Sequence, residues 1–318
     1  MPWLLTGLGL LILLLAGDAL VKGAVNLSLR VGIPALIVSL TIVAFGTSAP
    51  ELLIAINAVI DDKPGLALGN VIGSNTANVL LVLGIPALLT TLHTSGCRCL
   101  KTYLYMLAAT VLFIAIALTG EFTFTSGLIL LAALAFVLID AFRDARRHRR
   151  DNHARAQNGE IEGVEGADPD MPWWQIAVFL ILGLIGLPLG AEILVENASM
   201  IARHYGVSDA VIGLTLVALG TSLPELATTV MAALRKQADV ALGNVIGSNM
   251  FNLLAIIGIT SLVGGIPVDP EFLRFDLWVM LGASLMLIPF VFFKFDIGRG
   301  WGIGLTALYL TYITVVLV

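Results

Sequence analysis

The stretch Ala67-Leu-Gly-Asn-Val-Ile-Gly-Ser-Asn75 occurs a second time as Ala241-Leu-Gly-Asn-Val-Ile-Gly-Ser-Asn249. Each nonamer follows a hexamer of the pattern Gly-Thr-Ser-x-Pro-Glu, and both motifs are displaced by the same 174 positions. The chain therefore contains a duplicated unit. Polar groups that recur inside very apolar sequence are typical of the binding sites of membrane transport proteins.

The composition is that of a membrane protein. Hydrophobic residues make up 58% of the 318 residues and charged residues only 12%, which excludes an ordinary soluble domain. The apolar runs have the length of about 20 residues that a helix needs to cross a bilayer. The apolar N-terminus has no basic region, which indicates a first span instead of a signal peptide. The only cysteines, Cys97 and Cys99, fit neither a disulfide framework nor a zinc site and are interpreted as incidental loop thiols.

Clusters of charged residues, Gly and Pro divide the chain into ten predicted spans. These are residues 3–28, 34–60, 66–92, 101–119, 122–141, 174–201, 209–233, 239–264, 272–293 and 301–317. A hydrophilic linker at 142–172 separates a first five-span repeat at 1–141 from a second at 173–318. The linker begins rich in Arg and ends acidic, but it lacks EF-hand spacing, so we interpret it as a solvated connector and not as a calcium sensor.

The positions of Lys and Arg predict the orientation. With a cytoplasmic linker, thirteen of the 17 basic residues face the cytoplasm, and only Lys63, Arg203 and Arg274 face out. We expect a multi-pass protein of the plasma (inner) membrane with both termini outside. Because five is odd, the second half enters the membrane from the opposite side. The predicted fold is an all-α integral membrane protein of about ten transmembrane helices in two inverted five-helix repeats.

Glu51 and Glu225 lie near the middle of predicted spans, where a carboxylate costs about 3 kcal/mol. A proline directly before each glutamate removes one helical hydrogen bond and predicts broken helices. Carbonyl, hydroxyl and carboxylate oxygens in such a break suit hard cations, and the absence of His and Cys argues against zinc or copper. Two structural, protonated glutamates are the alternative, which the duplication disfavours.

Further polar residues share the faces of these spans by helical spacing. They are Thr47, Ser48, Thr221 and Ser222 beside the glutamates, and Ser74, Asn78, Ser248 and Asn252 in the spans that follow. The glycines of the nonamers form Gly-x-x-x-Gly, which predicts close helix packing. Asn70 and Asn244 are interpreted either as helix caps or as ion contacts.

Two further acids, Asp18 and Glu192, are also 174 positions apart. Lys22 follows Asp18 by four residues, which predicts a local ion pair on one helix. A role of these acids in ion transit or gating is the alternative interpretation.

The two hexamers and nonamers resemble the alpha-repeats of the sodium/calcium exchanger family of cation/calcium antiporters, in its compact prokaryotic form. The motifs cover four spans, and the ten-span plan extends the resemblance over essentially the whole chain. The resemblance implies that the broken second, third, seventh and eighth spans form a diamond of cation sites, with Glu51 and Glu225 as shared calcium ligands. It implies further ligands for Na+ and Ca2+ in Thr47, Ser48, Thr221, Ser222, Ser74, Asn78, Ser248, Asn252 and the carbonyls of Ala44 and Ala218.

The resemblance further implies a secondary antiporter that exports Ca2+ in exchange for Na+, with spans one and six sliding to alternate access. Such a protein is not an enzyme and needs no cofactor; its expected partners are the transported ions and the lipid bilayer, and no nucleic acid. Where several sodium-coupled members have Asp, this chain has Asn252, so the site carries two formal negative charges and three-for-one exchange is not implied. Exchange of Ca2+ for H+, or assisted by K+, is the alternative; a cation channel is disfavoured by inverted repeats.

Overall fold

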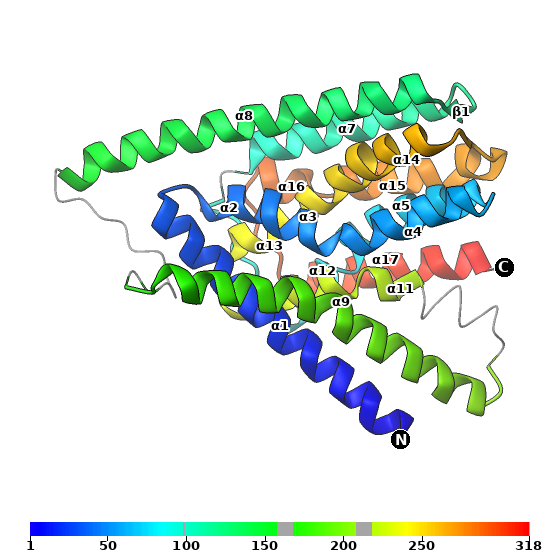
Figure 1. Ribbon diagram of the computed structural model, residues 1–318, viewed down its shortest axis with the longest axis horizontal. Helices are drawn as coiled ribbons and strands as arrows, with labels where there is room; N and C mark the ends of the chain where they lie inside the picture. The colour runs from blue at the N-terminus through cyan, green and yellow to red at the C-terminus, as the bar shows by residue number, and fades with distance from the viewer. Residues whose placement is uncertain (98, 158–167, 169, 208–217, 318) are drawn as a thin grey trace.

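A computed structural model describes residues 1–97, 99–157, 168, 170–207 and 218–317. Its elements are α1 (Pro2–Val31), α2 (Ala35–Val38), the π-helix η1 (Ser39–Val43), α3 (Ala44–Thr47), α4 (Ala49–Ile60), α5 (Pro64–Leu80), α6 (Gly84–Leu89), α7 (Leu100–Ala117), β1 (Glu121–Phe122), α8 (Phe124–Gln157), α9 (Trp173–His204), α11 (Ala218–Thr221), α12 (Leu223–Leu234), α13 (Ala238–Met250), the π-helix η3 (Phe251–Ile256), α14 (Ile257–Val263), β2 (Ile266–Pro267), the π-helix η4 (Phe272–Asp276), α15 (Leu277–Leu285), α16 (Ile288–Phe292) and α17 (Arg299–Leu317). Most helices run along the long axis of an elongated bundle (Figure 1).

The protein is a helical membrane protein. Among the described residues, seven helical segments are long and apolar enough to cross a membrane, and the bent pair Ala35–Thr47 and Ala49–Ile60 makes an eighth. Helices also occupy the predicted span at 301–317 and the later part of the predicted span at 209–233, whose first residues lie outside the described part of the chain.

One predicted boundary differs clearly from the structure. The span expected to end at residue 141 belongs to α8, which continues to Gln157 and includes the Arg-rich beginning of the predicted linker. Residues 142–157 contain Ala, Arg and Gln, which favour helix, and neither Gly nor Pro interrupts them. The prediction from polarity therefore began the linker too early in the chain, because a polar sequence that follows a span can remain helical.

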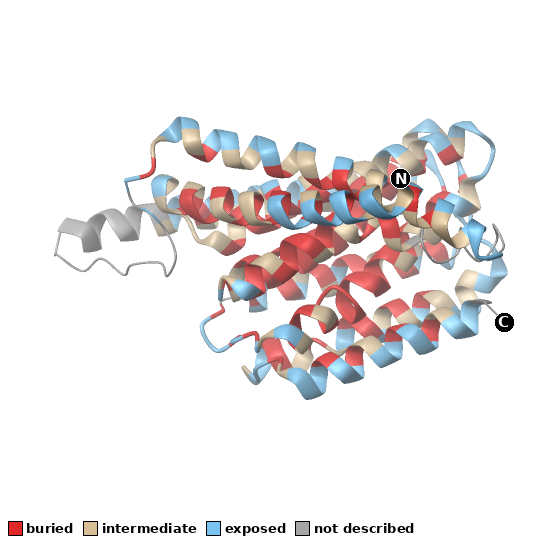
Figure 2. Cartoon of the chain, turned by 90° about the horizontal axis from the view of Figure 1, so that it is seen from below, coloured by how far each residue is buried: buried red, intermediate tan, exposed pale blue. Residues whose placement is uncertain are grey.

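The core lies around the two spans that carry the repeated nonamers. Within their apolar windows, Pro64–Leu89 is 83% buried and Ala238–Val263 is 89% buried, whereas the windows of the other long spans are at most 44% buried. Figure 2 shows buried residues in the middle of the bundle and exposed residues on its outer helices. The duplicated segments thus form the centre of the molecule.

The two longest helices on one side of the bundle, α1 and α9, pack along each other (Figure 1). Their contacts are reciprocal between the halves. A Cβ atom on Gly9 would lie 2.6 Å from the backbone nitrogen of Leu194, and one on Gly183 would lie 2.5 Å from the Cβ atom of Leu20. Gly183 is the repeat counterpart of Gly9, and Leu194 is that of Leu20, each 174 positions later in the chain. The two repeats therefore make the same contact with each other.

Short antiparallel pairings join the loops between helices. Strand β1 pairs with β2, so that Phe122 faces Ile266, and an isolated bridge joins Leu92 to Ile297. Ile266 is the repeat counterpart of Leu92, and the partners Phe122 and Ile297 correspond to within one position. These pairings fix the ends of the helices that surround the core.

Candidate cation-binding site

Two interrupted helices place the central carboxylates. Ser48 has φ −88° and ψ 3°, and its counterpart Ser222 has φ −89° and ψ 1°, so both serines leave helical geometry in the same way. The second-span helix bends by 43° at this point, as the sequence predicts. The cause is different from the expected proline kink, because Pro50 and Pro224 lie in the first turn of a new helix, where a missing N–H is harmless.

The breaks place Glu51 in the first turn of α4 and Glu225 in the first turn of α12. The partial positive charge of a helix N-terminus favours a carboxylate there. Both glutamates are only 1% exposed, and each has an Oε2 atom without a hydrogen-bond partner among the described residues. A cation between them would compensate both the buried charge and the missing partners.

Hydroxyl groups from both halves gather at the other oxygen of Glu225. Ser48 Oγ donates a hydrogen bond to Glu225 Oε1 at 3.2 Å, and Ser248 Oγ donates to the same atom at 3.4 Å. Thr47 Oγ1 lies 3.4 Å from Ser248 Oγ. The first repeat thus supplies Ser48 to a carboxylate of the second repeat and Thr47 to the Ser248 hydroxyl beside it, so these predicted residues from the two halves lie together.

The other expected ligands differ in their surroundings. Ser222 Oγ is buried and has no hydrogen-bond partner among the residues that the structure describes, and Ser74 is buried. The carbonyl of Ala44 accepts hydrogen bonds from Thr47 Oγ1 at 3.2 Å and from the backbone N–H of Ser48 at 3.0 Å. Thr221 is half-buried and has an interaction of its own, and Ala218 begins α11 next to undescribed residues.

The asparagines of α5 and α13 form a reciprocal contact that the sequence analysis missed. Asn75 Nδ2 donates to the carbonyl of Asn249 at 3.3 Å, and Asn249 Nδ2 donates to the carbonyl of Asn75 at 3.3 Å. Asn78 Nδ2 donates to Asn249 Oδ1 at 3.0 Å. The equal spacing of Asn75 and Asn249 in the two nonamers was the available sequence signal, because equivalent residues meet on the axis that relates two repeats.

Asn252 is the one predicted side chain whose amide is entirely without partners. Both its Oδ1 and Nδ2 atoms are buried and form no hydrogen bond with described residues, and Oδ1 of its counterpart Asn78 is also unpartnered. Asn252 lies in η3, and π-helical segments are frequent at functional sites. These amides can offer oxygen ligands without adding charge.

Of the two interpretations of Asn70 and Asn244, as helix caps or as ion contacts, the helix caps are wrong, because both residues lie inside their helices and beyond the first turn. Asn244 Nδ2 donates to the carbonyl of Glu225 at 3.3 Å and to Thr229 Oγ1 at 3.1 Å. Its Oδ1 atom accepts from Thr47 Oγ1 at 3.5 Å. Asn244 therefore joins the break that holds Glu225 to residues on both sides of the site.

The local ion pair predicted between Asp18 and Lys22 is also wrong. Asp18 instead accepts two hydrogen bonds from Arg235, from Nε at 2.5 Å and from Nη2 at 2.8 Å. The planar guanidinium matches both carboxylate oxygens, which a single ammonium group cannot do. The Lys22 ammonium lies 4.6 Å from the centre of the Phe179 ring.

The chemistry of the site is that of hard oxygen donors. No group of three or more His, Cys, Asp or Glu side chains that could hold a metal ion occurs among the described residues. Cys97 and Cys99 are buried free thiols. Two carboxylates, several hydroxyls and uncharged amides suit Ca2+ or Na+ better than transition metals.

The family model described as sodium/calcium exchanger protein matches residues 1–142 and 175–318. The chain is 33% identical to sodium/calcium exchanger MaX1 of Methanosarcina acetivorans, over 97% of this chain and 96% of that protein. It is 33% identical to inner membrane protein YrbG of Escherichia coli strain K12, over 96% and 93% of the two chains. A solved structure of the sodium-calcium exchanger NCX_Mj, soaked with Na+ and Sr2+, matches with a TM-score of 0.82 at 31% identity, over 98% of this chain and 97% of that one.

Proposed function

Because the chain belongs to the sodium/calcium exchanger family, and is thus a membrane cation/calcium antiporter, we propose that it exports Ca2+ from the cytoplasm in exchange for Na+ by alternating access. The observation that supports this most is the pair Glu51 and Glu225. Each is buried, each comes from a different half, and each keeps one carboxylate oxygen without a hydrogen-bond partner in the described part of the chain. A bound cation would stabilise buried charge in this arrangement.

The proposed ligands of Ca2+ are the two glutamates with hydroxyls from both repeats, since Ca2+ takes six to eight oxygen ligands. Na+ would use the same carboxylates in turn. The ligand set that we propose for the two ions together is Glu51, Glu225, Thr47, Ser48, Thr221, Ser222, Ser74, Asn78, Ser248, Asn252 and the carbonyls of Ala44 and Ala218.

We further propose ten spans in two inverted repeats, with the linker in the cytoplasm. The reciprocal Asn75 and Asn249 hydrogen bonds support a two-fold relation between the halves. In Figure 1 both chain termini lie at one end of the bundle, and the end of α8 lies at the other. This arrangement agrees with the distribution of Lys and Arg, which favours a cytoplasmic linker and outside termini.

The charge of the site points to the coupling ratio. Two carboxylates balance one Ca2+ or two Na+, and Asn252 adds oxygen but no charge. A third Na+ would bring an uncompensated charge into a poorly solvated site, which is costly. We therefore propose an electroneutral exchange of one Ca2+ for two Na+.

Calcium-45 uptake into proteoliposomes tests the proposed function. Vesicles loaded with Na+, and diluted into Na+-free medium, are expected to take up calcium, whereas vesicles with only a proton or potassium gradient are not. Uptake that is indifferent to the sodium gradient would contradict the sodium-coupled proposal. Calcium flux that needs no counter-ion at all would indicate a channel.

A further inference from the structure

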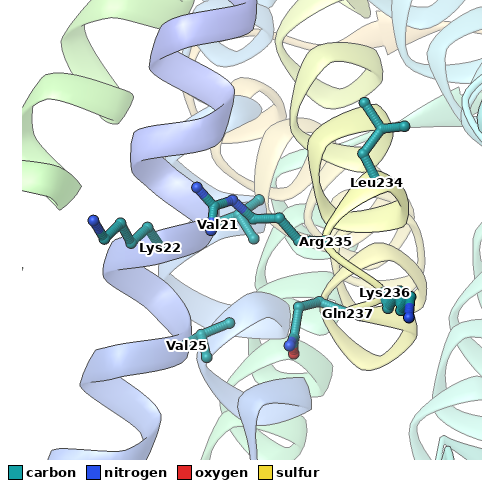
Figure 3. Close-up of a pocket in the computed structure, with 7 residues that line it drawn as sticks. All are labelled: Val21, Lys22, Val25, Leu234, Arg235, Lys236 and Gln237. Atoms are coloured by element: carbon teal, nitrogen blue, oxygen red, sulfur yellow. The ribbon is translucent and has the colours of Figure 1, made fainter. Parts of the chain in front are cut away.

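The ion pair between Asp18 and Arg235 joins two helices that belong to different halves of the chain. Arg235 follows the last residue of α12 and reaches toward α1, where Val21 lies beside it (Figure 3). A pocket of about 260 Å³ opens next to the pair, lined by residues of α1 and of the turn after α12. The two side chains are 34% and 33% exposed, so the pair is partly accessible to solvent.

The repeat counterpart of Arg235 is Asp61, and their turns have the same backbone. Arg235 has φ −85° and ψ 6°, and Asp61 has φ −84° and ψ 14°. The next residues, Lys236 and Asp62, both have φ 57°. Because the backbones agree, the two turns differ mainly in charge. The counterpart of Asp18 is Glu192, so the equivalent pair in the other half consists of two acids.

The packing around the pair also differs between the two halves. Helix α1 packs along α12, where a Cβ atom on Gly17 would lie 3.0 Å from the backbone of Ala227. Ala227 is 7% exposed, but its counterpart on α4, Leu53, is 63% exposed. Helix α9 packs along α1, touches α12, and makes no contact with α4 comparable to that between α1 and α12. The structure thus holds one of the two arrangements that a pair of inverted repeats allows.

We propose that Asp18 and Arg235 are positioning residues that hold the arrangement in which α1 covers α12. This inference rests on the proposed alternating access. In the reverse arrangement α9 covers α4, the Asp18–Arg235 pair is broken, and Glu192 approaches Asp61. One arrangement then gains an ion pair while the other brings two like charges together, so the charges of these four residues bias the exchange cycle toward one face.

Hydrogen exchange measured by mass spectrometry on the purified full-length protein tests this bias. In Arg235→Gln, exchange in α12 is expected to rise and exchange in α4 to fall, because α1 uncovers one helix as α9 covers the other. The shift in equilibrium is expected to be about fivefold, the upper range for a partly exposed ion pair. Asp61→Arg is expected to change hydrogen exchange as Arg235→Gln does, with a rise in α12 and a fall in α4, since it creates an ion pair with Glu192.

Two further variants separate positioning from simple stability. The charge swap Asp18→Arg with Arg235→Asp is expected to restore the exchange pattern of the unmodified protein. Lys101→Gln is the matched control, because Lys101 pairs with Asp140 and Asp144 between α7 and α8, away from α1 and α9, and it is expected to change neither helix.

An increase in α12 without a decrease in α4 would overturn the proposal, because local loosening affects only the first helix. Failure of the charge swap to restore the pattern would overturn it as well. Equilibrium binding of calcium-45 to the unmodified protein tests the proposed function separately, since neither Asp18 nor Arg235 lies among the proposed ligands. Normal calcium binding with unchanged exchange in Arg235→Gln would therefore contradict only the positioning role.

Discussion

At the scale of single residues, the proposed function depends most on Glu51 and Glu225. Each lies in the first turn of a helix that begins after a serine with non-helical backbone angles. Each is buried, and one of its carboxylate oxygens has no hydrogen-bond partner among the described residues. Helix dipoles and neighbouring hydroxyls favour the charged form of the carboxylates, but they do not neutralise two negative charges. We propose that a bound cation completes the site.

Replacement of either glutamate by glutamine is expected to abolish calcium uptake. Each glutamate and the bound cation form a buried pair of opposite charges, and loss of one partner of such a pair costs about 3 to 5 kcal/mol. This cost lowers the affinity for calcium by more than about 100-fold. Calcium-45 binding and uptake of Glu51→Gln and Glu225→Gln measure this loss. Glu196→Gln, on the exposed face of α9, is the control and should transport normally. Full uptake by a correctly inserted Glu225→Gln protein would exclude the proposed ligand role.

Asn252 sets the charge of the site, so Asn252→Asp is expected to change the coupling. A third carboxylate can compensate a further Na+, and uptake should become sensitive to membrane potential, whereas the unmodified protein should show little sensitivity. Calcium-45 uptake by both proteins, measured with and without a membrane potential set by potassium and valinomycin, tests this prediction. Strong potential dependence of the unmodified protein would rule out electroneutral exchange.

Residues whose chemistry is unusual for a membrane span can be identified from the sequence. Placing a glutamate inside an apolar span costs free energy whatever its partners are, so Glu51 and Glu225 are recognisable from sequence alone. Partner choice is different, because it depends on side chains that folding brings together. Asp18 therefore took a distant Arg235 instead of the neighbouring Lys22, and Asn75 met Asn249 across 174 positions.

At the scale of elements, the nonamer glycine Gly247 permits close packing of α13 against the second span. A Cβ atom there would lie 2.6 Å from Ala44 Cβ and 2.7 Å from the carbonyl oxygen of Leu40. Both neighbours belong to the segment that leads to the break at Ser48. The tight contact thus connects a packing glycine to the geometry of the site.

Gly247→Ala is expected to destabilise the protein by about 1 to 3 kcal/mol, the usual cost of overpacking, and to weaken calcium binding. Gly304→Ala is the control, because Gly304 is exposed on α17 and a Cβ atom there meets nothing within 4 Å. Thermal unfolding and calcium-45 binding in detergent compare the two variants. Equal behaviour of both would show that the close approach of α13 is not required.

The predicted spans agree well with helices because long apolar segments determine their own position in a membrane. Interruptions within spans are harder to predict. The π-helices η1 and η3 contain neither Gly nor Pro, so the usual signals of a helix interruption do not reveal them. Their position beside the site depends on packing against neighbouring helices, which the sequence of one segment does not contain.

At the scale of the whole molecule, the repeats predict which surfaces face the cytoplasm. Asp170→Cys, just before α9, is expected to react with a membrane-impermeant maleimide only in inside-out vesicles. Lys63→Cys, in the exposed turn before α5, is expected to react only in intact cells or right-side-out vesicles. The native Cys97 and Cys99 are buried and should contribute little labelling. Labelling of both new cysteines from the same side would contradict the inverted arrangement.

The duplication is visible in the sequence, but the difference between the halves is not. The repeats share motifs, turns and reciprocal contacts, yet Ala227 is covered while its counterpart Leu53 is exposed. The proposed alternating access requires such a difference, because two inverted halves that open to one side at a time are not both covered in the same way. The sequence therefore predicts the elements that the halves share, and the structure adds the difference between them.

Anomalous scattering from crystals soaked in Sr2+ tests the central claim most directly, because Sr2+ is a heavier substitute for Ca2+. We predict one strong peak between the carboxylates of Glu51 and Glu225, which weakens as the Na+ concentration of the soak is raised. A protein without a peak at these carboxylates, or with a peak that Na+ does not displace, would contradict it.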